Sequence, residues 1–93
     1  MNENNEVISL KVAGVELFFE PTLTAYNQMS NDAAKDSNVI GALRDYLMKI
    51  VTPESRDALS KVLLRPGAAA QIAKVVNEIY APDLEIEVKT SSA

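Results

Sequence analysis

The chain has 93 residues, of which 47% are hydrophobic, 13 are acidic and 9 are basic, giving a net charge of −4. This length and composition are typical of a single globular domain, which we predict to span residues 1–93. The sequence contains neither histidine nor cysteine. Their absence excludes histidine-based catalytic triads, thiol nucleophiles and the usual zinc sites. We therefore expect a non-enzymatic protein with no cofactor and no metal.

Lysine and arginine side chains are scattered singly along the chain. Nucleic-acid binding draws most of its affinity from clustered basic residues, so no nucleic-acid partner is predicted. No apolar run approaches the ~20 residues that a membrane span requires. The segment Met1–Glu6 is polar and acidic, unlike a secretory signal. These features predict a protein of the cytoplasm with no membrane partner.

The N-terminal part of the chain predicts a β-hairpin. Residues 7–12 and 15–20 both alternate apolar and polar side chains, which is the period of a half-buried strand. The two residues Ala13-Gly14 between them suffice for a tight turn, with the glycine at positive φ. Pairing Val12 with Val15 places all the inward apolar side chains on one face, which fixes the register. The other apolar pairs in this register are Leu10–Leu17 and Ile8–Phe19.

Four helices are predicted after the hairpin, and they must cover its apolar face. Thr22 can cap the first, residue 36, 37 or 38 the second, and Thr52 the third, where Pro53 stands at the first helical position. The polar stretch at residues 30–37 predicts a loop. The predicted helices run from Leu23 to about Met29, from Val39 to Val51, from Pro53 to about Leu64, and from Ala68 to Tyr80.

The C-terminal residues return to strand-like alternation. Ala81-Pro82-Asp83 stops the last helix, and Leu84–Lys89 then alternates apolar and acidic side chains. This segment is able to add to the hairpin edge as a third strand. The predicted fold is therefore α+β, a hairpin with a possible third strand packed against about four helices. Residues 1–5 and 90–93 are expected to be flexible.

Four stretches of sequence, spread over nearly the whole chain, stand in a specific order and spacing. They are Phe19-Glu20-Pro21-Thr22 with Tyr26-Asn27, Tyr46-Leu47-Met48-Lys49 leading to Pro53-Glu54, Pro66-Gly67-Ala68-Ala69 with Gln71-Ile72-Ala73, and Glu78-Ile79-Tyr80-Ala81-Pro82-Asp83-Leu84-Glu85-Ile86. Together they resemble the small tail assembly chaperones of long-tailed bacteriophages and prophages.

The resemblance implies a function that composition does not show. Such a chaperone binds the largely helical tape-measure protein in the cytoplasm of the bacterial host and keeps it soluble until the tail tube polymerises around it. It is absent from the mature virion. A longer, frameshifted form recruits tail tube protein in many of these phages. Self-association into a homo-oligomer is a further expectation for the family, through the same exposed surface.

Candidate partner-binding residues come from the residue pattern and not from the resemblance. The helix at Val39–Val51 carries a wider apolar stripe than a helix covered on one side needs. The segment Ala68–Ala73 offers small side chains against which a partner helix could lie closely. The predicted partner-binding residues are Met48, Val51, Ala69, Ala73 and Tyr80.

Two alternatives to the chaperone interpretation stay open. One is a small phage-encoded regulatory protein of the inhibitor or antitoxin type, which would also act by binding a protein. The other is a carrier protein modified at Ser37, because Asp36-Ser37 before a helix resembles the modified serine of acyl carrier proteins. The hairpin contradicts the helix bundle of that family, so helix capping is the favoured role of this dipeptide.

Overall fold

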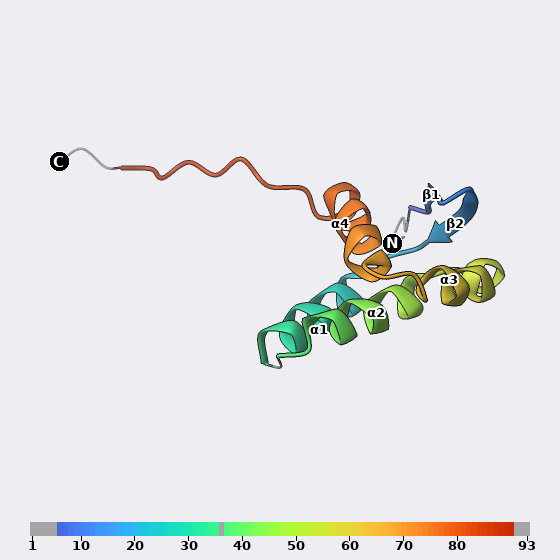
Figure 1. Ribbon diagram of the computed structural model, residues 1–93. Coiled ribbons are helices and arrows are strands. Elements are labelled where there is room, and N and C mark those ends of the chain that lie inside the picture. Colours follow the sequence, from blue (N-terminus) through green and yellow to red (C-terminus); the bar gives the residue numbers. More distant parts are fainter. Residues whose placement is uncertain (1–5, 36, 91–93) are drawn as a thin grey trace.

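The computed structural model describes residues 6–35 and 37–90 and has an α+β fold, as predicted (Figure 1). An antiparallel hairpin comes first, and four helices with one short 3-10 turn follow it. Of the residues predicted to be flexible, 1–5 and 90–93, the structure describes only Thr90, so this prediction lies almost wholly outside the described residues. The elements are β1 (Ile8–Val12), β2 (Val15–Phe19), α1 (Leu23–Lys35), α2 (Val39–Ile50), η1 (Pro53–Ser55), α3 (Arg56–Val62) and α4 (Ala68–Tyr80).

The hairpin has the predicted register. Val12 pairs with Val15, and the remaining pairs follow without a slip. Its two turn residues both have positive φ, 52° at Ala13 and 82° at Gly14. Two such residues form the type I′ turn whose twist matches that of the strands. The turn therefore places the less suitable residue, alanine, in a left-handed conformation that asparagine or glycine adopts at lower cost.

The outer edge of β2 is joined to the helical layer. The backbone N–H of Glu20 donates to the Ile50 carbonyl at 2.7 Å, and that of Thr52 donates to the Phe18 carbonyl at 2.9 Å. The Phe18 N–H donates to the Oγ of Ser55, a buried residue, at 3.0 Å. The segment between α2 and α3 therefore occupies the place of a third strand beside β2.

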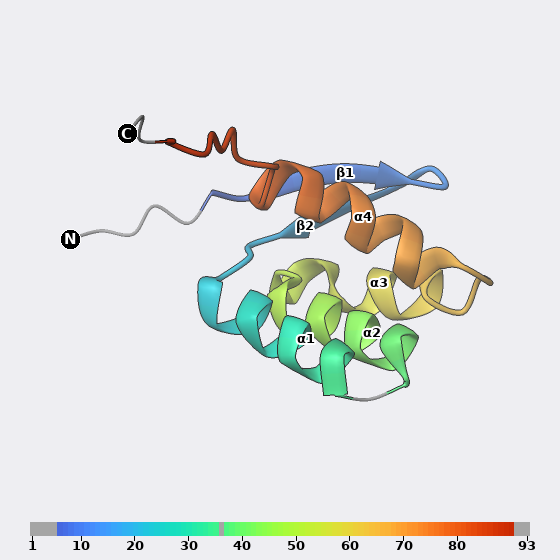
Figure 2. The ribbon, with the colours of Figure 1, turned by 90° about the vertical axis from the view of Figure 1, so that its left-hand side faces the viewer.

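Helix α1 extends to Lys35, so the loop predicted at residues 30–37 is wrong for residues 30–35. The sequence Ser30-Asn31-Asp32 favours helix only weakly, but Ala33-Ala34-Lys35 favours it strongly and places a cation at the C-terminal end. Helices α1 and α2 pack side by side along their length (Figure 2). This tertiary contact half-buries Asp32 and Ala33, which overrides the weak local propensity.

Two of the predicted caps are present, and the third is not. Thr22 Oγ1 accepts from the Ala25 N–H at 3.1 Å, and Asn38 Oδ1 accepts from the Gly41 N–H at 2.9 Å. Thr52 makes no side-chain cap. Its Oγ1 is buried without a hydrogen-bond partner among the described residues, because the Ser55 N–H donates to the Thr52 carbonyl instead. The first turn of the third predicted helix is accordingly a 3-10 turn, and α3 ends at Val62.

The core lies between the hairpin and the helices. Phe19, Leu17, Leu47, Leu59 and Val76 are fully buried there. A tyrosine cluster closes one side of the core. In this cluster, the rings of Tyr26 and Tyr46 meet edge to face at a centroid distance of 6.2 Å, the rings of Tyr26 and Tyr80 lie 5.9 Å apart, and the Tyr46 hydroxyl lies 3.0 Å from Asn77 Oδ1.

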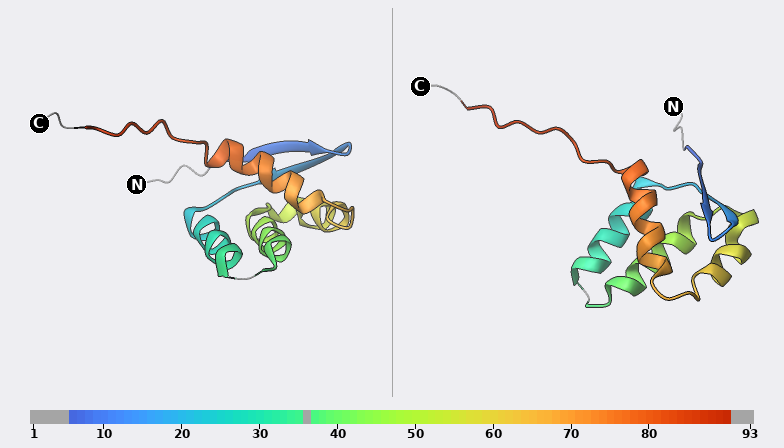
Figure 3. Two further views of the ribbon diagram at one scale, coloured as in Figure 1. Left: turned by 60° about the vertical axis from the view of Figure 1, so that its left-hand side comes forward. Right: turned by 45° about the horizontal axis from the view of Figure 1, so that its top comes forward.

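The third strand predicted at Leu84–Lys89 is not part of the sheet. After α4 the chain leaves the domain in an extended conformation, with no strand pairing (Figures 1 and 3). Its apolar side chains are exposed, with Val88 retaining 85% of its accessible surface. The edge of β2 is already occupied by the segment after α2, and the alternation of residues 84–89 finds no partner strand in the same molecule.

Candidate partner-binding surface

An apolar groove lies between the first half of α2 and the connection from α3 to α4. Its volume is about 270 Å³. Aliphatic side chains and the small residues at the start of α4 provide most of its walls. The groove is lined by Ile40, Arg44, Leu63, Leu64, Arg65, Pro66, Gly67, Ala69 and Ala70.

The wide apolar stripe of α2 supplies one wall. Tyr46 and Leu47 face the core and are almost completely buried. Near the start of the helix the stripe continues into solvent, where Val39 and Ile40 are exposed. Ile40 retains 53% of its accessible surface although it stands on a helix whose other face is packed. The extra width of the stripe is therefore not used within this domain.

The α3–α4 connection supplies the opposite wall. Leu63 is buried and anchors the end of α3, whereas Leu64 points outward and is 78% exposed. Pro66 prevents the helix from continuing, and Gly67 reverses the chain with a φ of 79°. This sharp reversal leaves Leu64 at the rim of the groove.

Two arginines give this apolar surface a positive border. Arg44 donates from its Nη1 to the Leu63 carbonyl at 3.4 Å, and so lies across the groove from α2 to the end of α3. Arg65 lines the same groove and is exposed. In a protein of net charge −4, a local pair of arginines beside exposed leucine and isoleucine is distinctive. The groove therefore combines an apolar lining with a positively charged border.

The five predicted partner-binding residues do not form one exposed surface. Val51, Ala69 and Ala73 are buried in the core, whereas Met48 and Tyr80 are half-buried. Ala69 does line the groove at its base. The residues that expose apolar surface there, Ile40 and Leu64, were not among the five. The width of the α2 stripe was a signal for Ile40, but the outward direction of Leu64 depends on the turn that follows it.

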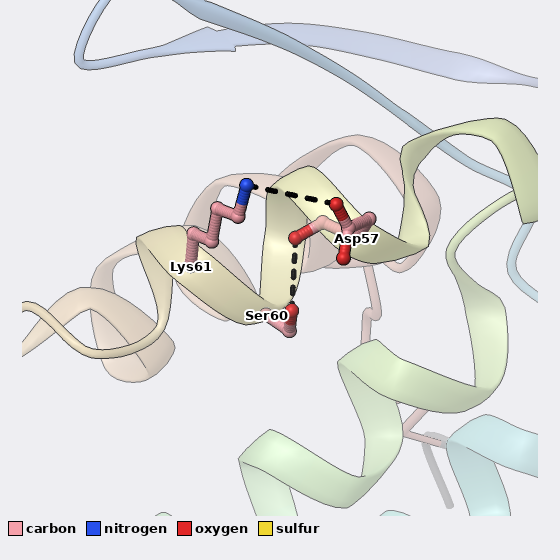
Figure 4. A network of polar contacts seen from close by, with 3 residues as sticks. All are labelled: Asp57, Ser60 and Lys61. Atoms are coloured by element: carbon pink, nitrogen blue, oxygen red, sulfur yellow. Dashed lines mark hydrogen bonds and ion pairs between the residues drawn. The ribbon is translucent and has the colours of Figure 1, made fainter.

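Other hollows and polar contacts offer less to a partner. A hollow of about 450 Å³ between α1 and α2 is lined mainly by side chains of mixed charge. On α3, Lys61 Nζ lies 3.7 Å from Asp57 Oδ2, and the Ser60 Oγ donates to the Asp57 carbonyl at 2.8 Å (Figure 4). Both residues of this ion pair are strongly exposed, so the pair contributes little stability.

Ser37 is exposed, but the oxygen that caps α2 belongs to Asn38.

Within residues 6–35 and 37–90 no group of three or more acidic side chains is placed so that it could hold a metal ion. None of the helices in these ranges is both long enough and apolar enough to cross a membrane.

The domain is a small hairpin covered by helices, with an exposed apolar groove and a projecting C-terminal segment. Comparison with known proteins identifies the family. Residues 8–90 match the family described as phage tail assembly chaperone, and the chain belongs to this family. It is 40% identical over 82 residues to an uncharacterized 11.3 kDa protein from the lys 3′ region of Haemophilus phage HP1, a match that covers 88% of this chain and 79% of that protein.

The fold also occurs in a solved structure. The uncharacterised protein rbstp2171 from Bacillus stearothermophilus superposes with a TM-score of 0.68 over 90% of both chains. The two sequences are 17% identical, so this likeness concerns the fold alone. The family membership confirms the resemblance seen in the sequence. This chain therefore acts in the assembly of phage tails, through contacts with tail proteins.

Proposed function

We propose that this chaperone binds helical segments of the tape-measure protein in the groove between α2 and the α3–α4 connection, and that it keeps this partner soluble during assembly of a long tail. The observation that carries the proposal is the exposed apolar surface of Ile40 and Leu64 beside Arg44 and Arg65. A chaperone must cover apolar surface on its client, and an apolar groove does this without a chemical reaction. The proposed role is therefore non-enzymatic.

The charge of the groove predicts which segments bind best. An apolar helix face places side chains at three- and four-residue spacing into the groove, and acidic residues beside that face would lie near the two arginines. Met48 and Tyr80, the half-buried residues of the predicted set, lie outside the groove lining. Any contact of theirs with the partner would extend the interface beyond the groove.

The proposal includes where and when the protein acts. Binding precedes polymerisation of the tail tube, so the chaperone works in the cytoplasm of the bacterial host and is absent from the mature virion. A longer, frameshifted form that recruits tail tube protein would place both partners on one chaperone. Mass spectrometry of purified virions is expected to detect the tape-measure protein and not this chain.

Capture of the tape-measure protein by purified variants tests the groove. Leu64→Glu replaces an exposed apolar side chain at the rim with a charge, and we expect it to weaken capture at least tenfold, which corresponds to about 1.4 kcal/mol. Arg44→Glu and Arg65→Glu together should weaken it as well and should reduce its dependence on salt.

The matched control is Leu23→Glu. Leu23 is an equally hydrophobic side chain, 64% exposed at the start of α1, and it does not line the groove. Capture by this variant should equal that of the wild type. If Leu64→Glu and Ile40→Glu both capture the tape-measure protein as well as Leu23→Glu does, the partner binds elsewhere and the groove is not the site.

A further inference from the structure

We define the C-terminal arm as residues Leu84–Lys89. The arm alternates apolar and polar side chains as a strand does, but it pairs with no strand among the described residues. Leu84, Ile86 and Val88 are 77–85% exposed and alternate with Glu85 and Glu87. In an extended chain this period places the three apolar side chains on one side and the two acids on the other. Three large aliphatic side chains in a row on one side of a projecting segment predict contact with another surface.

The free edge of the sheet belongs to β1. Ser9 pairs with Phe18 and Lys11 with Glu16. Phe18 directs its N–H and carbonyl outward, to Ser55 and Thr52, so the pair Ser9–Phe18 is a non-hydrogen-bonded pair of the ladder. The peptide groups of Ser9 and Lys11 must then point away from β2. No described residue forms a hydrogen bond with them, and such an edge is a template for an added strand.

An apolar strip on α4 borders this edge. Ala68 and Gln71 line a hollow together with Val12 and Ala13, which shows which side of α4 faces β1. At 100° per residue, Val75 and Ile79 lie on this same side of the helix. Both are exposed, at 40% and 52%, and α4 runs alongside β1 (Figure 2).

The opposite side of α4 is already in contact. Asn77 hydrogen-bonds to Tyr46 on α2, and Tyr80 packs against Tyr26 on α1. The strip of Val75 and Ile79 is therefore left over from the packing of the domain. A strand beside β1 would place its inward side chains over it.

The arm matches this place in both polarity and charge. Its aliphatic side chains would cover Val75 and Ile79. Its two glutamates would lie on the outer face of the sheet, where β1 presents Ser9 and Lys11. If Ile86 lies beside Leu10, one of the two glutamates is opposite Lys11 whichever way the arm runs, and opposite charges at such cross-strand positions are favourable.

We propose that the arm of one molecule adds to the free edge of β1 in a second copy of this chain. The second copy is the occupant because every chain carries both the arm and the edge, and because the arm projects away from its own sheet in each view (Figures 1 and 3). The longest dimension of the described chain is 59 Å, against 35 and 24 Å for the other two. A reciprocal exchange gives a dimer, and a head-to-tail exchange gives a ring or a chain.

Size-exclusion chromatography with light scattering tests the exchange by complementation. Ile86→Lys disables the arm and leaves the edge intact. Ser9→Pro disables the edge, because the N–H that it removes points away from β2, and leaves the arm intact. We expect the wild type to have at least twice the monomer mass, each variant alone to be monomeric, and an equimolar mixture to form a one-to-one heterodimer. Lys11→Glu, which changes only an exposed side chain of the same edge, replaces Ser9→Pro if that variant does not fold.

Three results would overturn the proposal. The first is a wild type that stays monomeric at every soluble concentration. A monomer whose arm pairs with its own β1, and so protects the β1 amides from hydrogen exchange, would be such a result. The second is an oligomer whose mass neither variant changes, which would place the contact elsewhere. The third is a mixture of the two variants that stays monomeric. None of these measurements involves the tape-measure protein, so their failure is distinct from a failure of the proposed function.

Discussion

The hydrogen bond from the Phe18 N–H to Ser55 Oγ is the side-chain contact through which the α2–α3 segment holds the outer edge of the sheet. Its length is 3.0 Å, and Ser55 is 5% exposed. The substitution Ser55→Ala removes the acceptor and leaves the N–H of a strand residue with no partner in the domain. The bond is part-buried, with Ser55 buried and Phe18 half-buried, so water would replace it incompletely. We therefore expect more than the loss of one exchanged bond, up to the full cost of an unsatisfied donor.

That cost is about 1–3 kcal/mol in the free energy of unfolding. For a domain of this size each kcal/mol lowers the melting temperature by roughly 4–8 °C, so the expected decrease is roughly 4–24 °C. Chemical denaturation followed by circular dichroism measures the free energy directly. The slope of that free energy against denaturant concentration should be unchanged, because the same surface becomes exposed on unfolding.

Ser60→Ala is the matched control. Ser60 lies on α3 and its Oγ also makes one hydrogen bond, but this residue is exposed and water can replace the bond (Figure 4). Its change in free energy should stay within about 0.5 kcal/mol. If Ser55→Ala and Ser60→Ala prove equally stable, the bond to Phe18 does not hold the sheet edge and the reasoning is refuted.

Three further predictions use the same denaturation assay. Thr52→Val should be neutral or raise the free energy of unfolding by up to about 1 kcal/mol, because it removes a buried hydroxyl that has no described partner; a loss of 1 kcal/mol or more would contradict this. Ala13→Asn should raise it by roughly 0.5–1 kcal/mol, since asparagine tolerates the positive φ of this turn position, and an unchanged or lower value would count against a type I′ turn. Burial, with Tyr80 and Tyr26 nearby, raises the pKa of Tyr46 above its usual value, so Tyr46 binds its proton more tightly in the folded state. Its contribution is complete below the unfolded pKa of about 10 and is lost as the pH rises beyond it, so Tyr46→Phe should lose about 1 kcal/mol at neutral pH and show a shallower decline in stability above pH 10 than the wild type.

The hairpin could be predicted from the sequence because its information is local. Two alternating segments around Ala13-Gly14 allow one register that buries every inward side chain, and the structure has that register. The helices follow from equally local signals, apart from their ends. The end of α1 depends on its contact with α2, which supports Asp32 and Ala33 in a helix that the polar composition of this stretch does not favour.

The position of the C-terminal segment could not be predicted in the same way. The alternation of Leu84–Lys89 correctly indicates an extended chain, but it cannot say which edge that chain meets or in which molecule. The structure shows that the α2–α3 segment already occupies the edge of β2 through Phe18 and Glu20. These contacts join residues thirty or more positions apart, and no local pattern reveals them.

The candidate site, too, could be predicted only where its signal is local in the sequence. The apolar stripe of α2 is visible in the sequence, and its excess width pointed to a partner. Which of the predicted binding residues reach solvent is decided by tertiary packing. Ala69 and Ala73 on α4, for example, are buried against the core. Leu64 lies in the turn between the end of α3 at Val62 and the reversal at Gly67, and its exposure depends on the course of that turn.

The soluble fraction of the tape-measure protein tests the central claim most directly. The tape-measure protein of the same phage or prophage would be expressed alone, with this chaperone, and with its Leu64→Glu variant at matched levels. The proposed function predicts that the tape-measure protein is largely insoluble alone, soluble with the wild type, and again largely insoluble with the variant. A tape-measure protein that is equally soluble in all three cultures would contradict it.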